Sequence, residues 1–182
     1  MGSSAVGADN VANGLDSNAF GHGNQALADS ANAFGTGNII SATAVSSSAF
    51  GVLNNIEGKE SVAFGFGNSI AYLADGASAV GHKNTVNGTG GSAIGNNNGA
   101  LAMYTTAIGN NNSTVGHNSS AVGQDNIING GADNSMAFGN ANIVSAVYGG
   151  AVGMNNTVSG ENAQAYGLSL IHISEPTRLG MI

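Results

Sequence analysis

The apolar positions of this chain recur with a fixed short period. A triplet of alanine, a bulky apolar residue and glycine starts first at Ala5 and last at Ala165, twelve times in all. Successive triplets start 14 residues apart eight times and 16 residues apart three times. Such a period, with one bulky residue per unit, is typical of a solenoid in which each unit forms one coil stacked on the next.

Each triplet lies in a stretch with the alternation of a β-strand. Within residues 17–21 the small side chains point to one face, and Asn18 and Phe20 point to the other. The bulky residues are β-branched or aromatic, which favours strands, and the recurrent glycine disfavours a helix. A fainter echo seven residues after each alanine, as in residues 86–88, predicts a second strand. We therefore expect an all-β parallel β-roll, or solenoid, of about twelve coils with two short strands each.

An asparagine stands five residues after the alanine in eleven of the twelve units, and Leu170 takes the twelfth place. The Gly-x-x-Asn spacing predicts a turn, because glycine supplies positive φ angles and asparagine hydrogen-bonds nearby backbone. Two interpretations stay open: independent turn residues, or stacked amides that form a ladder along the axis. The predicted turn residues are Asn10, Asn24, Asn38, Asn54, Asn68, Asn84, Asn98, Asn112, Asn126, Asn142 and Asn156.

Alternation alone does not show which face of the long strand lines the interior of a coil. We assign the bulky positions to the structural core, and we expect the opposite face of alanine, serine and glycine to pack against another copy. Small residues let two backbones approach closely. The predicted core residues are Val6, Phe20, Phe34, Phe50, Phe64, Val80, Ile94, Ile108, Val122, Phe138 and Val152.

The 16-residue units start at Ala33, Ala63 and Ala121, and each has its two extra residues between the asparagine and the next alanine. Two residues added to a strand would keep every side chain on its face. Two residues added to a turn would lengthen an exposed corner. The sequence permits both.

Composition excludes several classes of function. Only 7% of residues are charged, the net charge is −7, and Lys59 and Lys83 are the only basic residues before position 170. No basic stripe is therefore available for nucleic acid or an anionic membrane. Cysteine is absent, which excludes disulfides and thiolate metal sites. No apolar run is long enough to predict direct membrane insertion.

No motif in the sequence predicts catalysis, a metal or a cofactor. His22, His82 and His117 are scattered along the repeat without clustered carboxylates. Asp125 and Asp133 flank one enlarged unit, but the nonapeptide of calcium-binding β-rolls is missing. We expect no enzymatic activity, and the residues that would bind a ligand stay unknown at this stage.

Residues 61–68 and 92–98 resemble the Ser-x-Ala-apolar-Gly repeats of YadA-like heads of trimeric autotransporter adhesins. The resemblance covers residues 3–167. It implies a left-handed β-roll, a homotrimer, and display on the bacterial cell surface, tethered to the outer membrane through a stalk and anchor outside this stretch. The function implied is attachment to host extracellular matrix or cells, or autoagglutination. The alternative is a structural spacer in a surface fibre.

The two ends of the chain differ from the repeat in different ways. Ser3 already occupies a repeat position, so residues 1–167 are expected to be a fragment of a longer head, truncated at both ends. Residues 168–182 lack the repeat and hold the only proline and the only arginine. Residues 168–178 resemble the translation of a sequencing adapter, and we expect this tail to be non-native.

Overall fold

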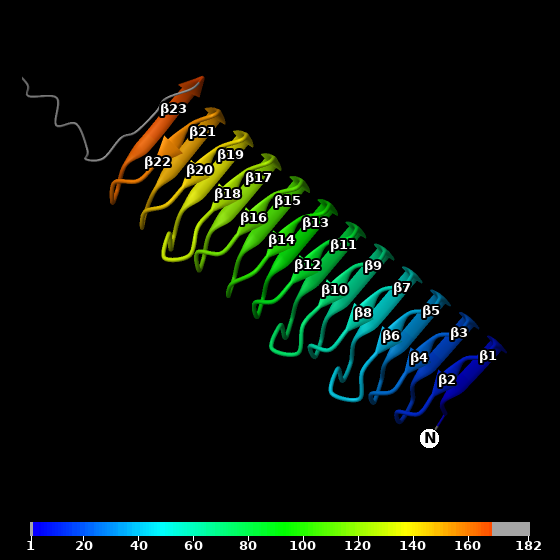
Figure 1. The fold of residues 1–182 in the computed structure, drawn as a ribbon. Coiled ribbons are helices and arrows are strands. Elements are labelled where there is room, and N and C mark those ends of the chain that lie inside the picture. The colour runs from blue at the N-terminus through cyan, green and yellow to red at the C-terminus, as the bar shows by residue number, and fades with distance from the viewer. Residues whose placement is uncertain (1, 169–182) are drawn as a thin grey trace, which may run out of the picture.

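The computed structural model describes residues 2–168, which form a parallel β-solenoid (Figure 1). Each of the first eleven coils contributes one strand of five residues and one of two residues, as the repeat predicts, and the twelfth contributes a long strand. The long strands are β1 (Ser4–Ala8), β3 (Asn18–His22), β5 (Asn32–Thr36), β7 (Ser48–Val52), β9 (Val62–Phe66), β11 (Ser78–His82), β13 (Ser92–Asn96), β15 (Thr106–Asn110), β17 (Ser120–Gln124), β19 (Met136–Asn140), β21 (Gly150–Met154) and β23 (Gln164–Leu168).

The short strands form a second sheet that faces the first. They are β2 (Val11–Ala12), β4 (Gln25–Ala26), β6 (Ile39–Ile40), β8 (Asn55–Ile56), β10 (Ser69–Ile70), β12 (Thr85–Val86), β14 (Gly99–Ala100), β16 (Ser113–Thr114), β18 (Ile127–Ile128), β20 (Ile143–Val144) and β22 (Thr157–Val158). The sheets have twelve and eleven strands, and each strand pairs in parallel with its counterparts in adjacent coils. The expected fold class is confirmed.

Register is kept along the whole rod. Ala5 pairs with Ala19, and the bulky residues and glycines that follow pair in the same way. The 16-residue units obey the same rule, because Ala33 pairs with Ala49 across the extra two residues. Those residues lie in the corners that lead from a short strand to the next long strand. We call these connections the outer corners; they have seven residues at 41–47, 71–77 and 129–135 and five elsewhere (Figure 1).

The interior is filled by small side chains from the long strands and by larger ones from the short strands. The repeat alanines from Ala19 to Ala165 are fully buried, and they face residues such as Ile40, Ile56 and Ile70, which are also fully buried. The assignment of the bulky positions to the core is therefore wrong for the folded chain. Val6 is 52% exposed and Phe64 is 58% exposed.

None of the predicted core residues is buried: Val6, Phe20, Phe34, Phe50, Phe64, Val80, Ile94, Ile108, Val122, Phe138 and Val152 all lie on the outer face of the long-strand sheet. The physical reason is the thinness of the coil. In seven of the eleven short strands the inward residue is isoleucine or valine, and in the others it is alanine or threonine, so the narrow gap between the sheets is filled with alanine on the long-strand side. The expectation that the small face meets another copy is wrong for the same reason.

The described residues contain strands, turns and bends, and within them no helix could cross a membrane. Leu168, the first residue of the expected non-native tail, is the last residue of β23 and pairs with Met154. The remainder of that tail, including Leu170, lies outside the described residues.

Candidate functional site

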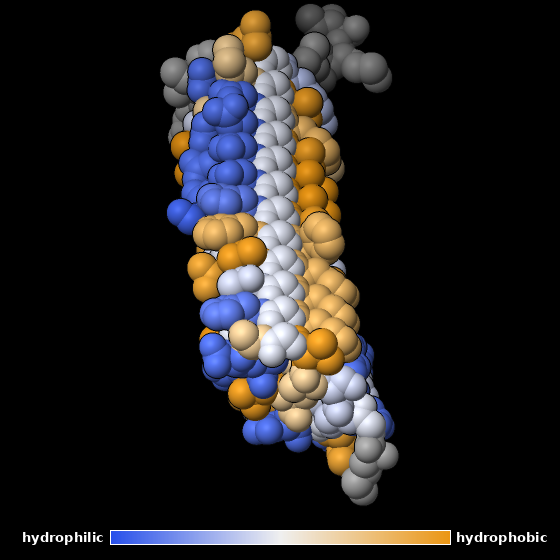
Figure 2. Space-filling view, turned by 90° about the vertical axis from the view of Figure 1, so that its right-hand side faces the viewer, coloured by the Kyte–Doolittle hydropathy of each residue, from blue (hydrophilic) through white to orange (hydrophobic). Residues whose placement is uncertain are grey.

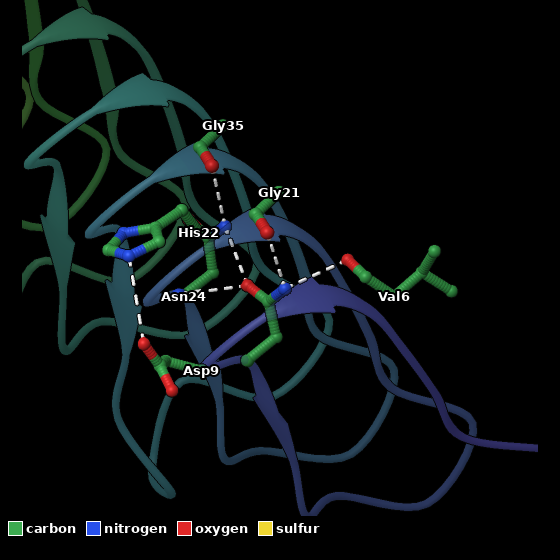
Figure 3. A network of polar contacts seen from close by, with 7 residues as sticks. Val6, Asp9, Gly21, His22, Asn24 and Gly35 are labelled. Atoms are coloured by element: carbon green, nitrogen blue, oxygen red, sulfur yellow. Dashed lines mark hydrogen bonds and ion pairs between the residues drawn. The ribbon is translucent and has the colours of Figure 1, made fainter.

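The turn that follows each long strand holds a ladder of buried asparagines. The Nδ2 of Asn24 donates to the Oδ1 of Asn10 at 3.0 Å, to the carbonyl of Phe20 at 3.0 Å and to the carbonyl of Gly35 at 2.8 Å. Its Oδ1 accepts bonds from the backbone N–H and the Nδ2 of Asn38. Figure 3 shows the start of this ladder.

The same pattern continues to the last predicted turn residue, and the Nδ2 to Oδ1 distances lie between 2.9 and 3.2 Å. From Asn24 onward the two hydrogens of each Nδ2 are therefore divided among three acceptors, so one hydrogen is shared between two of them. Of the two interpretations of the asparagines, the structure shows the ladder. It satisfies carbonyls that would otherwise be buried at the turn.

The glycine of each triplet is required because adjacent coils stack too closely there for a side chain. Gly109 has φ 120°, and a Cβ atom there would lie 2.0 Å from the carbonyl oxygen of Gly123 in the next coil. The other triplet glycines from Gly7 to Gly153 also have positive φ angles and leave no room for a Cβ atom beside the next coil. Together the glycines contribute to the pale stripe that runs along the rod in Figure 2. A side chain at this position would push adjacent coils apart.

Beside the glycine stripe runs a band of apolar side chains, the positions that were assigned to the core (Figure 2). Phe20 and Phe34 stack with ring centroids 5.0 Å apart, Phe34 and Phe50 with centroids 5.3 Å apart, and Phe50 and Phe64 are tilted at 6.3 Å. We call these outward bulky residues the apolar band. A continuous band of half-exposed and exposed apolar side chains of this length is unusual for a soluble monomer and indicates a surface that contacts another molecule.

The outer corners form an open hollow of about 620 Å³ on the C-terminal side of the enlarged corner 71–77. The corners of the next three coils are short, so the wall made by residues 71–77 stands beyond its neighbours. Its lining is mainly apolar, with Asp75, Thr89 and His117 among the polar groups. The apolar side chains that line it are Leu73, Leu101, Met103 and Val115.

Hydrogen bonds between successive corners fix the walls of the hollow. The hydroxyl of Thr89 donates to the carbonyl of Leu73 at 2.7 Å, and the backbone N–H of Met103 donates to Nδ1 of His117 at 3.3 Å. The N–H of His117 in turn donates to Oδ1 of Asp133 at 2.8 Å. These bonds join corners one coil apart, so the hollow is preformed.

The structure keeps the three histidines of the described residues apart. His22 lies 3.6 Å from Asp9, both well exposed (Figure 3), His82 stacks on Phe66 with centroids 5.2 Å apart, and His117 lines the hollow. Among residues 2–168 no group of three or more histidine and acidic side chains could hold a metal ion.

Asp125 lies in a turn of the ladder edge, at the end of a short row of exposed amides. Asn111 donates to it at 2.6 Å and Gln124 at 3.0 Å. These hydrogen bonds, that from Asn111 first, hold the pKa of the Asp125 carboxyl below its ordinary value of 3.8. The bond from Asn111 joins this turn to the turn of the preceding coil.

The residues of the hollow were not predicted from the sequence. The sequence does contain a feature that could have indicated the hollow: apolar residues such as Leu73 and Met103 stand at turn positions near one of the enlarged units. Turn positions are usually polar, so an apolar side chain there is informative. What the repeat could not show is that four successive corners bring these side chains to one place.

Comparison with known families matches two copies of the YadA head domain repeat, at residues 74–98 and 100–126. The resemblance drawn from the repeat is thereby confirmed for these coils, which include most of the residues that line the hollow. No curated protein matches the sequence.

Proposed function

We propose that this chain is part of the head of a trimeric adhesin, displayed on the bacterial surface and tethered to the outer membrane by parts outside this stretch. The observation that supports the proposal most directly is the apolar band, together with the match to the YadA head repeat. The head presents a long repetitive surface for attachment to host matrix or cells. No catalytic residue is proposed.

The apolar band has the properties of an interface between identical chains. Its members recur once per coil in strict register, so two parallel copies would align their bands along the full rod. Burial of the band would remove large exposed side chains such as Phe64 from water, at about 25 cal/mol per Å² of apolar surface. We expect three parallel copies, as the YadA-like resemblance implies.

The oligomeric state tests this proposal. Sedimentation equilibrium of the purified chain should give a trimer, and the double change of Phe50→Asp and Phe64→Asp should give monomers whose far-UV circular dichroism still shows a β-solenoid. Tyr148→Asp is the matched control, because this exposed aromatic residue lies on an outer corner away from the apolar band. A folded parent that stays monomeric at all concentrations would contradict the proposal.

Adhesion needs a separate test. The trimer should bind at least one of collagen, fibronectin and laminin in a solid-phase assay, or else cause cells that display it to agglutinate. A trimer that does none of these would instead favour the spacer function, in which the rod only holds another head away from the cell.

A further inference from the structure

We propose that the hollow on the outer corners binds an extended peptide segment that carries apolar side chains between two cationic residues. The proposal rests on the adhesin function above and names the chemistry of the segment that a host protein would present. Nothing in the self-association of the head requires this site, because the apolar band lies on the outer face of the long-strand sheet.

The lining of the hollow is suited to apolar side chains. Leu73 is 72% exposed and Met103 is 45% exposed, and Leu101 and Val115 lie with them in the same lining. Exposed apolar side chains beside a preformed depression are what a binding pocket needs, because burying them releases water without reorganising the backbone. Methionine adds adaptability, since its thioether packs against many shapes.

The charge around the hollow selects a cationic partner. On the outer corners of the described coils seven carboxylates stand against a single lysine, Lys59; the carboxylates are Asp16, Asp29, Glu57, Glu60, Asp75, Asp133 and Glu161. No lysine or arginine lines the hollow itself. An anionic segment would be repelled, whereas a cationic one would be attracted at long range.

Two of these carboxylates mark the ends of the site. Asp75 lines it on one side, and Asp133 bonds His117 on the other. Both lie in enlarged corners, and both use Oδ1 to accept a backbone N–H from the preceding corner, that of Lys59 for Asp75 at 2.8 Å. The second oxygen of each carboxylate is left for a partner.

The distance between the two carboxylates sets the length of the segment. They are four coils apart, and parallel strands are spaced by about 4.8 Å, so the ends lie about 19 Å from each other. An extended chain advances about 3.3 Å per residue, so two cationic residues about six positions apart would reach both ends. Alternate residues between them would point toward the apolar lining.

Tyr104, which follows Met103 at the tip of its corner, supplies an anchor. It is 59% exposed and has φ 55°, a left-handed conformation that aromatic residues rarely adopt. Its ring lies over Gly90, where a Cβ atom would be 2.7 Å from the ring. Elsewhere this position is mostly aspartate, serine, asparagine, glycine or glutamate, so an outward tyrosine here fits a contact residue, a role in which tyrosine is enriched.

Isothermal titration calorimetry with synthetic peptides tests the proposal. The probe is Arg-Leu-Ser-Ile-Ser-Leu-Arg, which has cationic ends six positions apart and three apolar residues on one face. We expect it to bind the folded trimer, and we expect at least tenfold weaker binding when glutamate replaces both arginines or when serine replaces the three apolar residues.

The protein variants have a matched control. Asp75→Asn with Asp133→Asn keeps an oxygen for each backbone bond, removes both charges, and should weaken binding of the probe at least tenfold. Asp29→Asn removes one charge of the same kind from the same edge, where Asp29 accepts the N–H of Leu15 at 2.8 Å, and should change binding by less than twofold. Met103→Ser should weaken binding, and Tyr148→Ser should not.

Several results would overturn the inference. The probe could fail to bind the trimer at millimolar concentration, or Asp29→Asn could weaken binding of the probe as much as the double variant does. A third such result is dissociation of the trimer by Leu73→Ser with Met103→Ser, which would make a second copy of the chain the occupant of the hollow. Failure of the adhesin function itself looks different. A trimer that binds matrix proteins but not the probe contradicts only this inference, whereas a monomer that binds neither contradicts the function.

Discussion

The two edges of the coil differ in how much their length and sequence vary along the rod. At the ladder edge, where the long strand turns into the short one, Gly-x-x-Asn has the same length in all eleven described turns, from Asn10 to Asn156. At the outer-corner edge the connection has five or seven residues, and its tips carry residues as different as Lys59, Asp75 and Tyr104. One edge repeats without exception, and the other varies from coil to coil.

The difference follows from what each edge does for its neighbours. At the ladder edge the amide of each asparagine from Asn24 onward bonds the coils on both sides, and a Cβ atom on any triplet glycine from Gly7 to Gly153 would clash with the carbonyl oxygen of the next coil. A change in one coil therefore disturbs two others. At the outer corners the backbone is also bonded from coil to coil, as from the N–H of Ser30 to the carbonyl of Leu15 at 2.8 Å, but the side chains at the tips face water, so these tips can vary and can carry recognition.

The largest expected effect comes from the glycine stripe. Gly109→Ala would place a Cβ atom 2.0 Å from the carbonyl oxygen of Gly123, at a φ angle of 120° that alanine avoids. We expect a loss of about 4 kcal/mol in the free energy of unfolding, measured by urea denaturation. Gly76→Ala, on an outer corner with φ 65° and no atom within 4 Å of its Cβ position, should cost only about 1 kcal/mol. Equal losses of stability in Gly109→Ala and Gly76→Ala would contradict the proposed difference between the two edges.

Removal of one amide from the ladder should come next. Asn98→Leu would remove the acceptor of the Asn112 N–H, one of the three acceptors of the Asn112 Nδ2, and the donor that Asn98 provides to the carbonyls of Ile94 and Gly109. We expect about 3 kcal/mol of destabilisation in the same denaturation experiment, because buried polar groups lose their partners. Asn97→Ser, an exposed neighbour, should cost about 0.5 kcal/mol or less. A neutral Asn98→Leu would show that the asparagines act as separate turn residues.

Shortening an enlarged corner should have a small effect on stability and a large one on the hollow. Deletion of Tyr72 and Leu73 gives residues 71–77 the length of the other corners, and it keeps the register of β9 and β11. We expect a change below about 1 kcal/mol in thermal unfolding, because loop length has a weak effect on closure entropy. Deletion of Gly67 and Asn68 from the ladder edge removes the same number of residues and should prevent cooperative folding of the adjacent coils.

The smallest expected effect concerns pH. Hydrogen bonds from Asn111 and Gln124 lower the pKa of Asp125, so they favour the charged form in the folded chain. The local stabilisation is present above the ordinary pKa of 3.8 and is lost as the pH falls through the lower folded pKa. An NMR titration should place the midpoint of Asp125 below 3.8, and Asn111→Ala should raise it. A midpoint that does not move in the variant would contradict this assignment.

The repeat alone was sufficient to predict the solenoid. The 14 and 16 residue periods, the alternation around each alanine and the constant asparagine predicted two strands per coil, parallel stacking and a turn at Gly-x-x-Asn. These are local properties of one unit, and repetition makes them hold for every unit. The expectation of a YadA-like head came from the same residues, and the matched repeats confirm it for residues 74–98 and 100–126.

Three features were decided by the tertiary structure. A strand has two faces, and its alternation is the same whichever face points inward, so the sequence could not show that Ala63 is buried and Phe64 exposed. The distance between the two sheets decides it, because Ile56 and Ile70 fill the gap. Likewise, only stacking shows whether an asparagine bonds its own turn or its neighbour, and only stacking gathers Leu73, Met103 and Val115 into one hollow, because those residues come from different coils.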